Sequence, residues 1–378
     1  MFNKISELYW EIMGARLPRD VFGAIQGDDN AERLTSLEKN YQSLAKEFDP
    51  GNYIDNLDNR ARAIEASEKL KELYEMAKHQ LAANQYESVM AVTQSNMELI
   101  SSPKGDQYAV MKQEQLANAP SYRLYVCNQQ STGRNCLLQI ATDIKHNGSL
   151  DRMSYILKEF VGFAQELEEE YAKNPRNAGK ELGYQYGFPE LVDSFISSEQ
   201  KNRRINILAF RCVADIEDMV ALGMIGGKYC KRVDLRTSGW IMGKALKMID
   251  FAHSNGVAVN ATSERDIVVE FKKNKHYVVL FNWAEAEIFR DTVPEEKRLR
   301  DISQAAQSVI AVLGGDWKRN FLPDDGEKAF PKYSEYLLRL AQGLGGHNAE
   351  RAHSRFYEIV DEFWPREFYP FTTKNLND

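Results

Sequence analysis

Two polar side chains that could bind a metal ion flank a pair of apolar strands predicted within Phe251–Trp283, which reads FAHSNGVAVNATSERDIVVEFKKNKHYVVLFNW. Asp266 comes directly before the first strand, Ile267–Phe271, and Asn282 comes directly after the second, Tyr277–Phe281. Carboxylate and amide oxygens are ligands of magnesium, although a neutral ligand binds a hard cation weakly. This stretch therefore allows at most one metal ion, held by Asp266 and Asn282.

A helix and a loop must position these two residues. The predicted helix runs from Thr237 to Ala252 and is followed by His253 and by Asn255-Gly256, which lead into a short apolar strand. Its apolar side chains recur at helical spacing, at Ile241, Ala245, Leu246, Ile249 and Ala252. The polar loop Asn260–Arg265 then precedes Asp266.

Before this stretch, the pattern predicts short strands around one long helix, Leu150–Ala172. The predicted strands are Tyr108–Met111, Tyr122–Val126, Cys136–Ala141 and Ile205–Phe210. The turn between the first two strands, Leu116–Ser121, contains no glycine, and Pro120 removes one backbone N–H. After Trp283 the sequence is mainly helical.

The composition is that of an ordinary globular protein: 378 residues, 43% hydrophobic and 27% charged. The net charge of −7 argues against broad binding to nucleic acid or to anionic membranes. We expect no membrane span and no signal peptide, because there is no run of about 18 apolar residues and acids interrupt the N-terminal apolar stretch. The cysteines are scattered, which predicts reduced, mostly buried thiols of a cytoplasmic protein, at Cys127, Cys136, Cys212 and Cys230.

Residues 1–95 are predicted to be all helical. One helix runs from a cap at Asp29 or Asn30 to about Phe48, and another from about Leu57 to Asn84. Asp49-Pro50-Gly51-Asn52 separates them, because proline cannot continue a helix. A shorter helix, Ile5–Met13, is expected to pack across this pair.

The chain as a whole resembles bacterial proteins in which a J-domain precedes a degenerate protein-kinase-like part. The segments that carry this resemblance are FPELVDSF (188–195), RRINIL (203–208), GWIMGKALKMIDFAHSNGV (239–257), YVVLFNW (277–283), DISQAAQSVIAVLGGD (301–316) and WPREFYPF (364–371). The resemblance implies a two-lobed kinase-like fold, with strands and one helix first and mainly helices after.

The resemblance also places the residues that phosphoryl transfer needs. The catalytic aspartate falls on Ala261, the asparagine that follows it on Asp266, and the magnesium-binding aspartate on Asn282. The strand lysine that holds the phosphates falls on Gln139, and the glycine-rich loop on Leu116–Ser121. Losing the base alone costs about 10²–10⁴-fold in rate, so the combined changes predict a pseudokinase without transfer activity.

Structural residues of the kinase-like part persist. The resemblance assigns Asp301, expected to open the helix before Gly314-Gly315, to the acid that tethers the catalytic loop. We interpret His253 as a structural residue at the base of the lobe rather than a catalytic histidine. Glu159, the helix acid that would pair with the strand lysine, has no cation to pair with at Gln139 and is expected to be solvated.

The N-terminal resemblance to the J-domain, a co-chaperone module, is carried by LYWEIMGA and LEKNYQSLAKEFDP. The family's His-Pro-Asp signature is replaced by Phe48-Asp49-Pro50. We therefore expect a J-like docking bundle that does not stimulate a chaperone, with Phe48, Asp49 and Pro50 as candidate contacts to a partner.

The aromatic C-terminal segment offers further candidate contacts, at Trp364, Arg366 and Phe368. Aromatic residues and arginine dominate interface hot spots. The alternative is that this segment wraps the large lobe and buries its rings.

These observations predict an α+β protein with three parts: a J-domain-like helical bundle (1–95), a kinase-like small lobe (96–212) and a kinase-like large lobe with a helical tail (213–378). The leading hypothesis is a non-catalytic adaptor or scaffold that binds protein partners and needs no cofactor. One alternative is an atypical enzyme that binds ATP and magnesium in a cleft through Gln139, Asp266 and Asn282. Another is a divergent co-chaperone.

Overall fold

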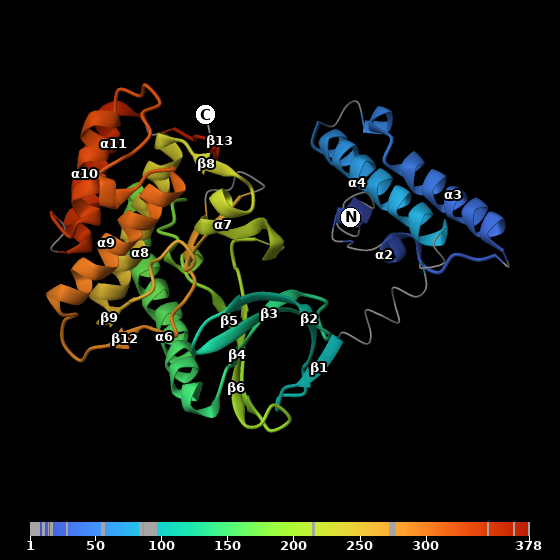
Figure 1. Cartoon of the computed structure of the whole chain (residues 1–378), viewed down its shortest axis with the longest axis horizontal. Coiled ribbons are helices and arrows are strands. Elements are labelled where there is room, and N and C mark those ends of the chain that lie inside the picture. The colour runs from blue at the N-terminus through green and yellow to red at the C-terminus, as the bar shows by residue number, and fades with distance from the viewer. Residues whose placement is uncertain are drawn as a thin grey trace. The chain divides into compact units, whose positions relative to one another are not determined.

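The structure is a computed structural model of the chain, which divides into two compact units, Met1–Met97 and Glu98–Asp378. We call them the N-terminal and the C-terminal unit and describe each by itself (Figure 1). The residues that the structure describes are 8–9, 12–13, 15, 18–27, 29–53, 57–82, 86, 97–213, 216–271, 277–345, 348–365 and 367–376.

The N-terminal unit is helical, as predicted. Its elements are α2 (Pro18–Phe22), α3 (Asn30–Glu47), the short 3-10 helix η1 (Pro50–Tyr53) and α4 (Leu57–Ala82). Asp29 caps α3, because its carboxylate accepts hydrogen bonds from the amides of Ala31 and Glu32 at 2.8 Å. The end of the second predicted helix, 83–84, and most of the first, Ile5–Met13, lie outside the described residues.

The apolar stripes of these helices meet in one core. Fully buried side chains come from both long helices and from the turn that joins them: Leu37, Phe48, Ala63, Ala66, Leu70, Leu73 and Ala77. Burial of large apolar side chains contributes about 1.5–3 kcal/mol each, which makes this cluster the main stabilising feature of the unit.

The C-terminal unit begins with a curled six-stranded sheet of order β1-β2-β3-β4-β6-β5 (Figure 1). Its strands are β1 (Met97–Ser101), β2 (Gln107–Asn118), β3 (Tyr122–Gln129), β4 (Asn135–Ala141), β5 (Glu190–Ser197) and β6 (Arg203–Ala209), and the pairings from β2 to β5 are antiparallel. Helix α6 (Asn147–Ala172) connects β4 to β5 and packs against β5 and β6. Strand β2 extends further than predicted, and β1 and β5 were not predicted as strands.

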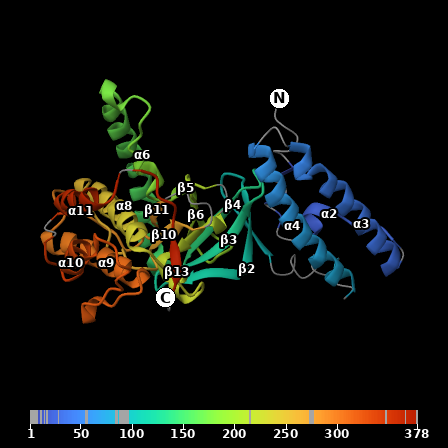
Figure 2. The same cartoon turned by 90° about the horizontal axis from the view of Figure 1, so that it is seen from above.

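The rest of this unit is mainly helical. The helices are α7 (Leu222–Gly227), α8 (Leu235–Ser254), α9 (Glu295–Val312), α10 (Phe330–Ala341) and α11 (Ala349–Phe363), and α8 packs against both α9 and α11 (Figure 2). Short strands pair between them: β7 (Met219–Ala221), β8 (Lys231–Val233), β9 (Val257–Ala258), β10 (Ile267–Glu270), β11 (Val278–Leu280), β12 (Glu287–Ile288) and β13 (Thr373–Asn375). Because α9 begins at Glu295, Asp301 lies inside the helix, and the expectation that Asp301 opens it was wrong.

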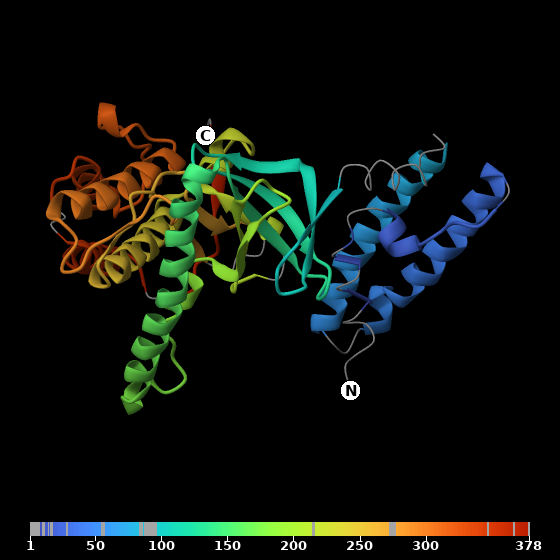
Figure 3. The same cartoon turned by 90° about the horizontal axis from the view of Figure 1, so that it is seen from below.

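An aromatic cluster joins the sheet-and-helix half to the helical half. The ring of Phe160, on α6, lies 5.0 Å from that of Phe251 on α8 and 4.9 Å from that of Trp283, measured between centroids. The rings of Phe160 and Phe188 are 5.5 Å apart. Edge-to-face contacts of this kind stabilise beyond simple area burial, so the two halves share one core along α6 (Figure 3).

The four cysteines are free thiols. Cys127 and Cys136 are buried, Cys212 is half-buried and Cys230 is exposed, so the prediction of mostly buried thiols holds for only part of the set. Within the described ranges, no helix is both long enough and apolar enough to cross a membrane.

Candidate functional site

The loop that carries Ala261 and Asp266 lies between β9 and β10, just after α8 ends. Gly256 makes the turn out of the helix with a φ of +71°, and a Cβ there would lie 2.7 Å from the carbonyl oxygen of Phe289. Only glycine fits such a position without strain. Asn260 also has a positive φ, 57°, which asparagine tolerates better than most residues.

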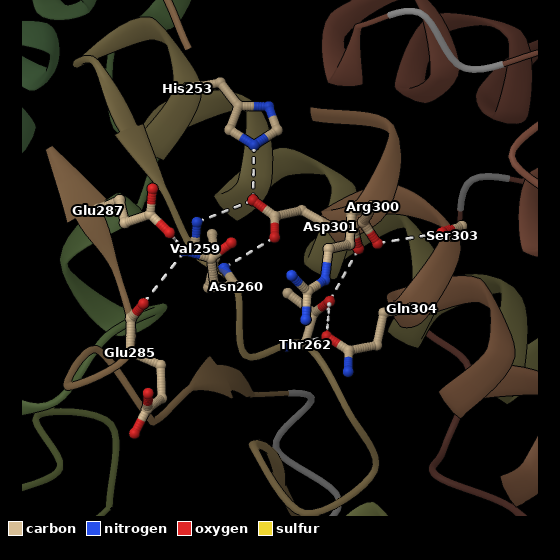
Figure 4. Close-up of polar contacts among 10 residues, drawn as sticks. All are labelled: His253, Val259, Asn260, Thr262, Glu285, Glu287, Arg300, Asp301, Ser303 and Gln304. Atoms are coloured by element: carbon tan, nitrogen blue, oxygen red, sulfur yellow. Dashed lines mark hydrogen bonds and ion pairs between the residues drawn. The ribbon is translucent and has the colours of Figure 1, made fainter. Parts of the chain in front are cut away.

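Asp301 anchors this loop from α9. Its carboxylate is fully buried and accepts hydrogen bonds from the amides of Val259 and Asn260, each at 2.8 Å (Figure 4). Nε2 of His253 lies 2.9 Å from the same carboxylate. The carboxylate of Asp301 is bonded to two main-chain amides of the loop and to the ring of His253. Asp301 therefore joins the loop backbone to His253 at the end of α8.

A second set of bonds fixes the remainder of the loop. The hydroxyl of Thr262 donates to the main-chain oxygen of Asp301 at 2.8 Å, and its amide donates to Gln304 Oε1 at 3.0 Å (Figure 4). Nδ2 of Asn260 donates to Glu285 O at 3.1 Å and to Glu287 Oε1 at 3.0 Å. Buried polar groups cost free energy unless they are paired, and here the pairing fixes the backbone conformation of the loop.

Ala261, at the position expected for a catalytic base, is buried. Only 4% of its surface is exposed, and its methyl group carries no proton acceptor. The loop is therefore positioned, but no group at this residue could accept a proton from a substrate hydroxyl.

Asp266 and Asn282, which come just before β10 and just after β11, are brought together. The antiparallel register of β10 and β11 sets Ile267 opposite Leu280, and the next residues along, Asp266 and Phe281, are joined by a 2.8 Å hydrogen bond from the amide of Phe281 to the main-chain oxygen of Asp266. Asn282 Nδ2 donates to Asp266 Oδ1 at 3.0 Å, and Asn282 Oδ1 accepts from the amide of Ala284 at 3.2 Å. The hydroxyl of Ser263 donates to the other oxygen of Asp266. The hydrogen bonds of both side chains are therefore made to each other and to neighbouring residues.

Gln139 lies apart from this pair, within the sheet. It is fully buried on β4, and its Oε1 accepts from Asn206 Nδ2 on β6 at 3.3 Å. Asn206 Nδ2 also donates to Leu150 O at 3.0 Å, and Asn206 Oδ1 accepts from the hydroxyl of Ser194 at 2.8 Å. Gln139 Nε2 is buried without a partner. The three residues of the predicted nucleotide cleft thus do not form one exposed site in this structure.

The turn between β2 and β3, at the position expected for a glycine-rich loop, is tied to the helical half. Ser121 donates from its hydroxyl to Glu285 Oε1 at 2.8 Å, a contact between residues 164 positions apart. Tyr122 beside it is 4% exposed, and its pKa is raised by burial and by the negative charges of Asp266 and Glu285. A buried phenol and two acids therefore lie where this turn meets the loop after β11.

Helix α6 contributes an arginine to the same region. Arg152 Nη2 donates to the main-chain oxygen of Ala284 at 3.2 Å. Glu159, on the same helix, is exposed, in agreement with the expectation of a solvated side chain. Sequence reasoning missed Ser121, Glu285 and Arg152, because contacts between segments so far apart leave no local pattern.

The candidate partner contacts differ in exposure. Phe48 is fully buried in the N-terminal core, so it offers no surface to a partner in this conformation, while Asp49 is exposed and Pro50 is half-buried. In the tail, Trp364 is 9% exposed and lies 5.9 Å from Tyr333 between ring centroids, whereas Phe368 is 72% exposed. Arg366 lies outside the described residues. The tail thus combines a buried anchor with an exposed ring.

No group of three His, Cys, Asp or Glu side chains that could hold a metal ion occurs among the residues whose placement is described. Asp266 is the one carboxylate of the predicted cleft, and Ser263 and Asn282 already bond both of its oxygens.

A search with protein-family models and a search of curated proteins both find no match to this chain. Solved structures similar to it include a double mutant of the Mycobacterium tuberculosis PknI kinase domain, with a TM-score of 0.40, 13% identity and coverage of 67% of this chain and 96% of that one. Another is vaccinia related kinase 3, with a TM-score of 0.45, 11% identity and coverage of 73% and 94%.

The order of elements in the C-terminal unit matches the expectation from the sequence. A sheet is interrupted after its third long strand by α6 and is followed by a mainly helical half, and an acid of α9 anchors the loop between β9 and β10. The C-terminal unit, Glu98–Asp378, is therefore a curled antiparallel sheet with one long helix, followed by a mainly helical half.

Proposed function

We propose that this chain is a non-catalytic adaptor or scaffold, a pseudokinase joined to a degenerate J-like docking bundle, which binds protein partners. One observation carries the proposal: Nδ2 of Asn282 donates to Oδ1 of Asp266 at 3.0 Å, at the positions where metal ligands are expected. Oδ1 of Asn282 accepts from the amide of Ala284, and the second oxygen of Asp266 accepts from the hydroxyl of Ser263. Phosphoryl transfer depends on charge neutralisation by metal ions and cations, and this pair is engaged internally.

The surroundings support the same conclusion. The base position is a buried alanine, and Gln139 has no exposed surface. After burial, the negative charges of Asp266 and Glu285 raise the pKa of Tyr122, so both carboxylates lie near this ring. Two like charges repel a triphosphate more strongly where water is partly excluded, so ATP would have to overcome both the field and the Ser121–Glu285 hydrogen bond.

Transfer of label from radiolabelled ATP to the chain or to candidate protein substrates tests the loss of catalysis. We expect the same background signal for the wild type and for Asp266→Ala. Label transfer by the wild type that Asp266→Ala abolishes would overturn the proposal.

Thermal unfolding with and without ATP and magnesium tests the alternative of a nucleotide-binding enzyme. A ligand at about 100 times its dissociation constant stabilises a protein by about 2.7 kcal/mol, which is easily measured. We expect no shift. A shift that Asp266→Ala removes would favour the nucleotide-binding alternative, for which the half-buried carboxylate of Asp266 is the specific observation.

The adaptor role itself calls for co-purification of the full chain with its partners and identification by mass spectrometry. A parallel ATPase assay of a heat-shock chaperone with the full chain tests the co-chaperone alternative. We expect no increase in turnover, because Phe48, in place of the signature histidine, is buried in the core. A several-fold increase would contradict this part of the proposal.

A further inference from the structure

A small cavity of about 210 Å³ lies on α8, away from the residues discussed so far. Its walls come from the segment before β5, from α8, and from the residues that open β11. The polar side chains that line it are those of Glu181, Tyr186, Lys244, Lys247 and Tyr277.

Two lysines one helical turn apart give this cavity its charge. Lys244 and Lys247 are both half-buried on α8, and residues spaced i, i+3 lie on the same face of a helix. Neither forms an ion pair with a carboxylate of the described residues. Lys247 Nζ donates to the main-chain oxygen of Leu182 at 2.6 Å and lies 4.5 Å from the ring centroid of Tyr184.

The nearby acids do not neutralise this pair. The charge of Glu168 acts to raise the pKa of Lys247. Its carboxylate, however, accepts hydrogen bonds from the amides of Leu182 and Gly183, at 2.8 and 3.2 Å. Glu181 is exposed at the rim of the cavity. Two partly desolvated ammonium groups therefore face the same space without a fixed counter-ion.

The titration of these groups is consistent with uncompensated positive charge. Burial and the charge of Lys244 lower the pKa of Lys247 to about 8, and burial lowers the pKa of Lys244. The pKa of His353, on α11, is lowered by burial and then by the charges of Lys247 and Lys244. A bound anion would reverse these shifts, because an opposite charge within about 4–6 Å favours the charged form of an amine.

We infer that this cavity binds a small phosphomonoester, with Lys244 and Lys247 contacting the phosphate and Tyr186 and Tyr277 packing against its organic part. A phosphomonoester dianion matches two ammonium groups in charge, whereas a single carboxylate would leave one uncompensated. The rings of Tyr186 and Tyr277 lie 5.7 Å apart and offer an apolar wall. The volume is below the usual range of about 300–1,000 Å³ for drug-sized ligands, which favours a ligand smaller than a nucleoside triphosphate.

Titration calorimetry with phenyl phosphate and the full chain tests this inference. We expect binding that is weakened at least tenfold in Lys244→Met and lost in the double variant Lys244→Met/Lys247→Met. Lys158→Met, which removes an exposed lysine on α6, is the matched control and should leave binding unchanged. Lys247→Arg keeps the charge and should bind within about threefold of the wild type.

Three outcomes would overturn the inference. They are the absence of phenyl phosphate binding to the folded wild type, equal binding by Lys244→Met, and equal binding of benzoate and phenyl phosphate. A tyrosine-phosphorylated peptide that binds more than tenfold tighter than phenyl phosphate would also overturn it, since the ligand would then be a phosphorylated protein. Circular dichroism of each variant confirms that a loss of binding is not a loss of folding.

Discussion

The loop between β9 and β10 has two sides, and they differ in what their polar groups do. On one side, the buried carboxylate of Asp301 accepts hydrogen bonds from two loop amides and contacts His253, an arrangement that we call the anchor. On the other side, Asp266 and Asn282, the cleft pair, bond each other. The anchor holds the backbone in place, whereas in the cleft pair both carboxylate oxygens of Asp266 accept hydrogen bonds from neutral side chains. The difference shows that one side of the loop fixes its backbone conformation, whereas the other side places polar side chains beside β10 and β11.

Removal of the anchor should have the largest effect. Asp301→Ala would leave the amides of Val259 and Asn260 unpaired in a buried site, and it would also remove the partner of His253. Breaking a buried charged network costs about 3–5 kcal/mol. We expect a loss of that size in the free energy of unfolding, measured by chemical denaturation.

The control for this experiment is Asp291→Ala, which removes an exposed aspartate and should change stability by less than about 0.5 kcal/mol. If Asp301→Ala were as stable as this control, the anchor would not hold the loop, and the contrast between the two sides would fail.

A change in the cleft pair should have an intermediate effect. Asn282→Asp would place two carboxylates about 3.0 Å apart in place of the present hydrogen bond, and like charges at that distance disfavour joint ionisation. We expect a loss of about 1–3 kcal/mol near neutral pH, measured by thermal and chemical unfolding. Added magnesium should restore part of this loss, because two acids can share a cation.

Asn282→Leu serves as the comparison for the magnesium arm, because it also breaks the pair but adds no charge. Stabilisation of Asn282→Leu by magnesium would show that the effect does not come from the cleft pair. Stabilisation of the wild type would show that the native pair can bind a cation, and would remove the contrast with the anchor.

Substitution of Gln139 should have a smaller effect still. Its Nε2 has no partner, and its Oε1 receives one long bond of 3.3 Å from Asn206. Gln139→Leu removes an unpaired buried donor, which is favourable, and also removes the hydrogen bond from Asn206, which is unfavourable. Asn206 keeps its bond to Leu150 O, so the gain and the loss largely cancel. We expect a change within about 1 kcal/mol in the free energy of unfolding. A loss above about 3 kcal/mol would show that Gln139 is as essential to the fold as the anchor.

The smallest effect concerns acid stability at the edge of the anchor. Hydrogen bonds from Lys297, and to a lesser degree from Asn260, lower the pKa of Glu287. When a carboxyl group has a lower pKa in the folded protein than in the unfolded chain, it stabilises the fold at a pH above its unfolded-state pKa. This stabilisation is lost as the pH falls through the folded-state pKa. Since Glu287 is largely solvated, we expect only about 0.2–0.5 kcal/mol.

The measurement is the difference in unfolding free energy between the wild type and Glu287→Gln, followed from pH 7 to pH 3. The difference should shrink as the pH falls below the ordinary range of a glutamate. A difference that grows with acid would contradict the assignment.

Local patterns predicted the elements well, because each helix carried its own signals. Asp29 caps α3 and the Asp49-Pro50 break ends it, as expected, and α8 (Leu235–Ser254) lies within two residues of its predicted limits, Thr237–Ala252. Strand β5 was missed because its pairing with β6 is a tertiary feature. The start of α9 was misplaced because the acids before Asp301 already form its first turns.

The site could be predicted only where neighbouring residues determine it. Asp266 and Asn282 come directly before and after two apolar strands that pair, so the pairing places them close together, although it sets Asp266 opposite Phe281. The Ser121–Glu285 bond and the Gln139–Asn206 pair join residues 164 and 67 positions apart and required the folded chain. Exposure was equally hard to infer, because Trp364 is buried and Phe368 is exposed within the same aromatic segment.

The aromatic cluster around Phe160 has a consequence for motion. Phe160 touches Phe251 and Trp283, so the sheet half and the helical half of the C-terminal unit cannot separate without breaking core contacts. We therefore expect opening between them to cost a large share of the free energy of global unfolding. Hydrogen exchange should report this as equal protection of amides in β4 and in α8, with both sets exchanging only in molecules that unfold entirely. Such a unit behaves as a single rigid platform rather than a hinged clamp.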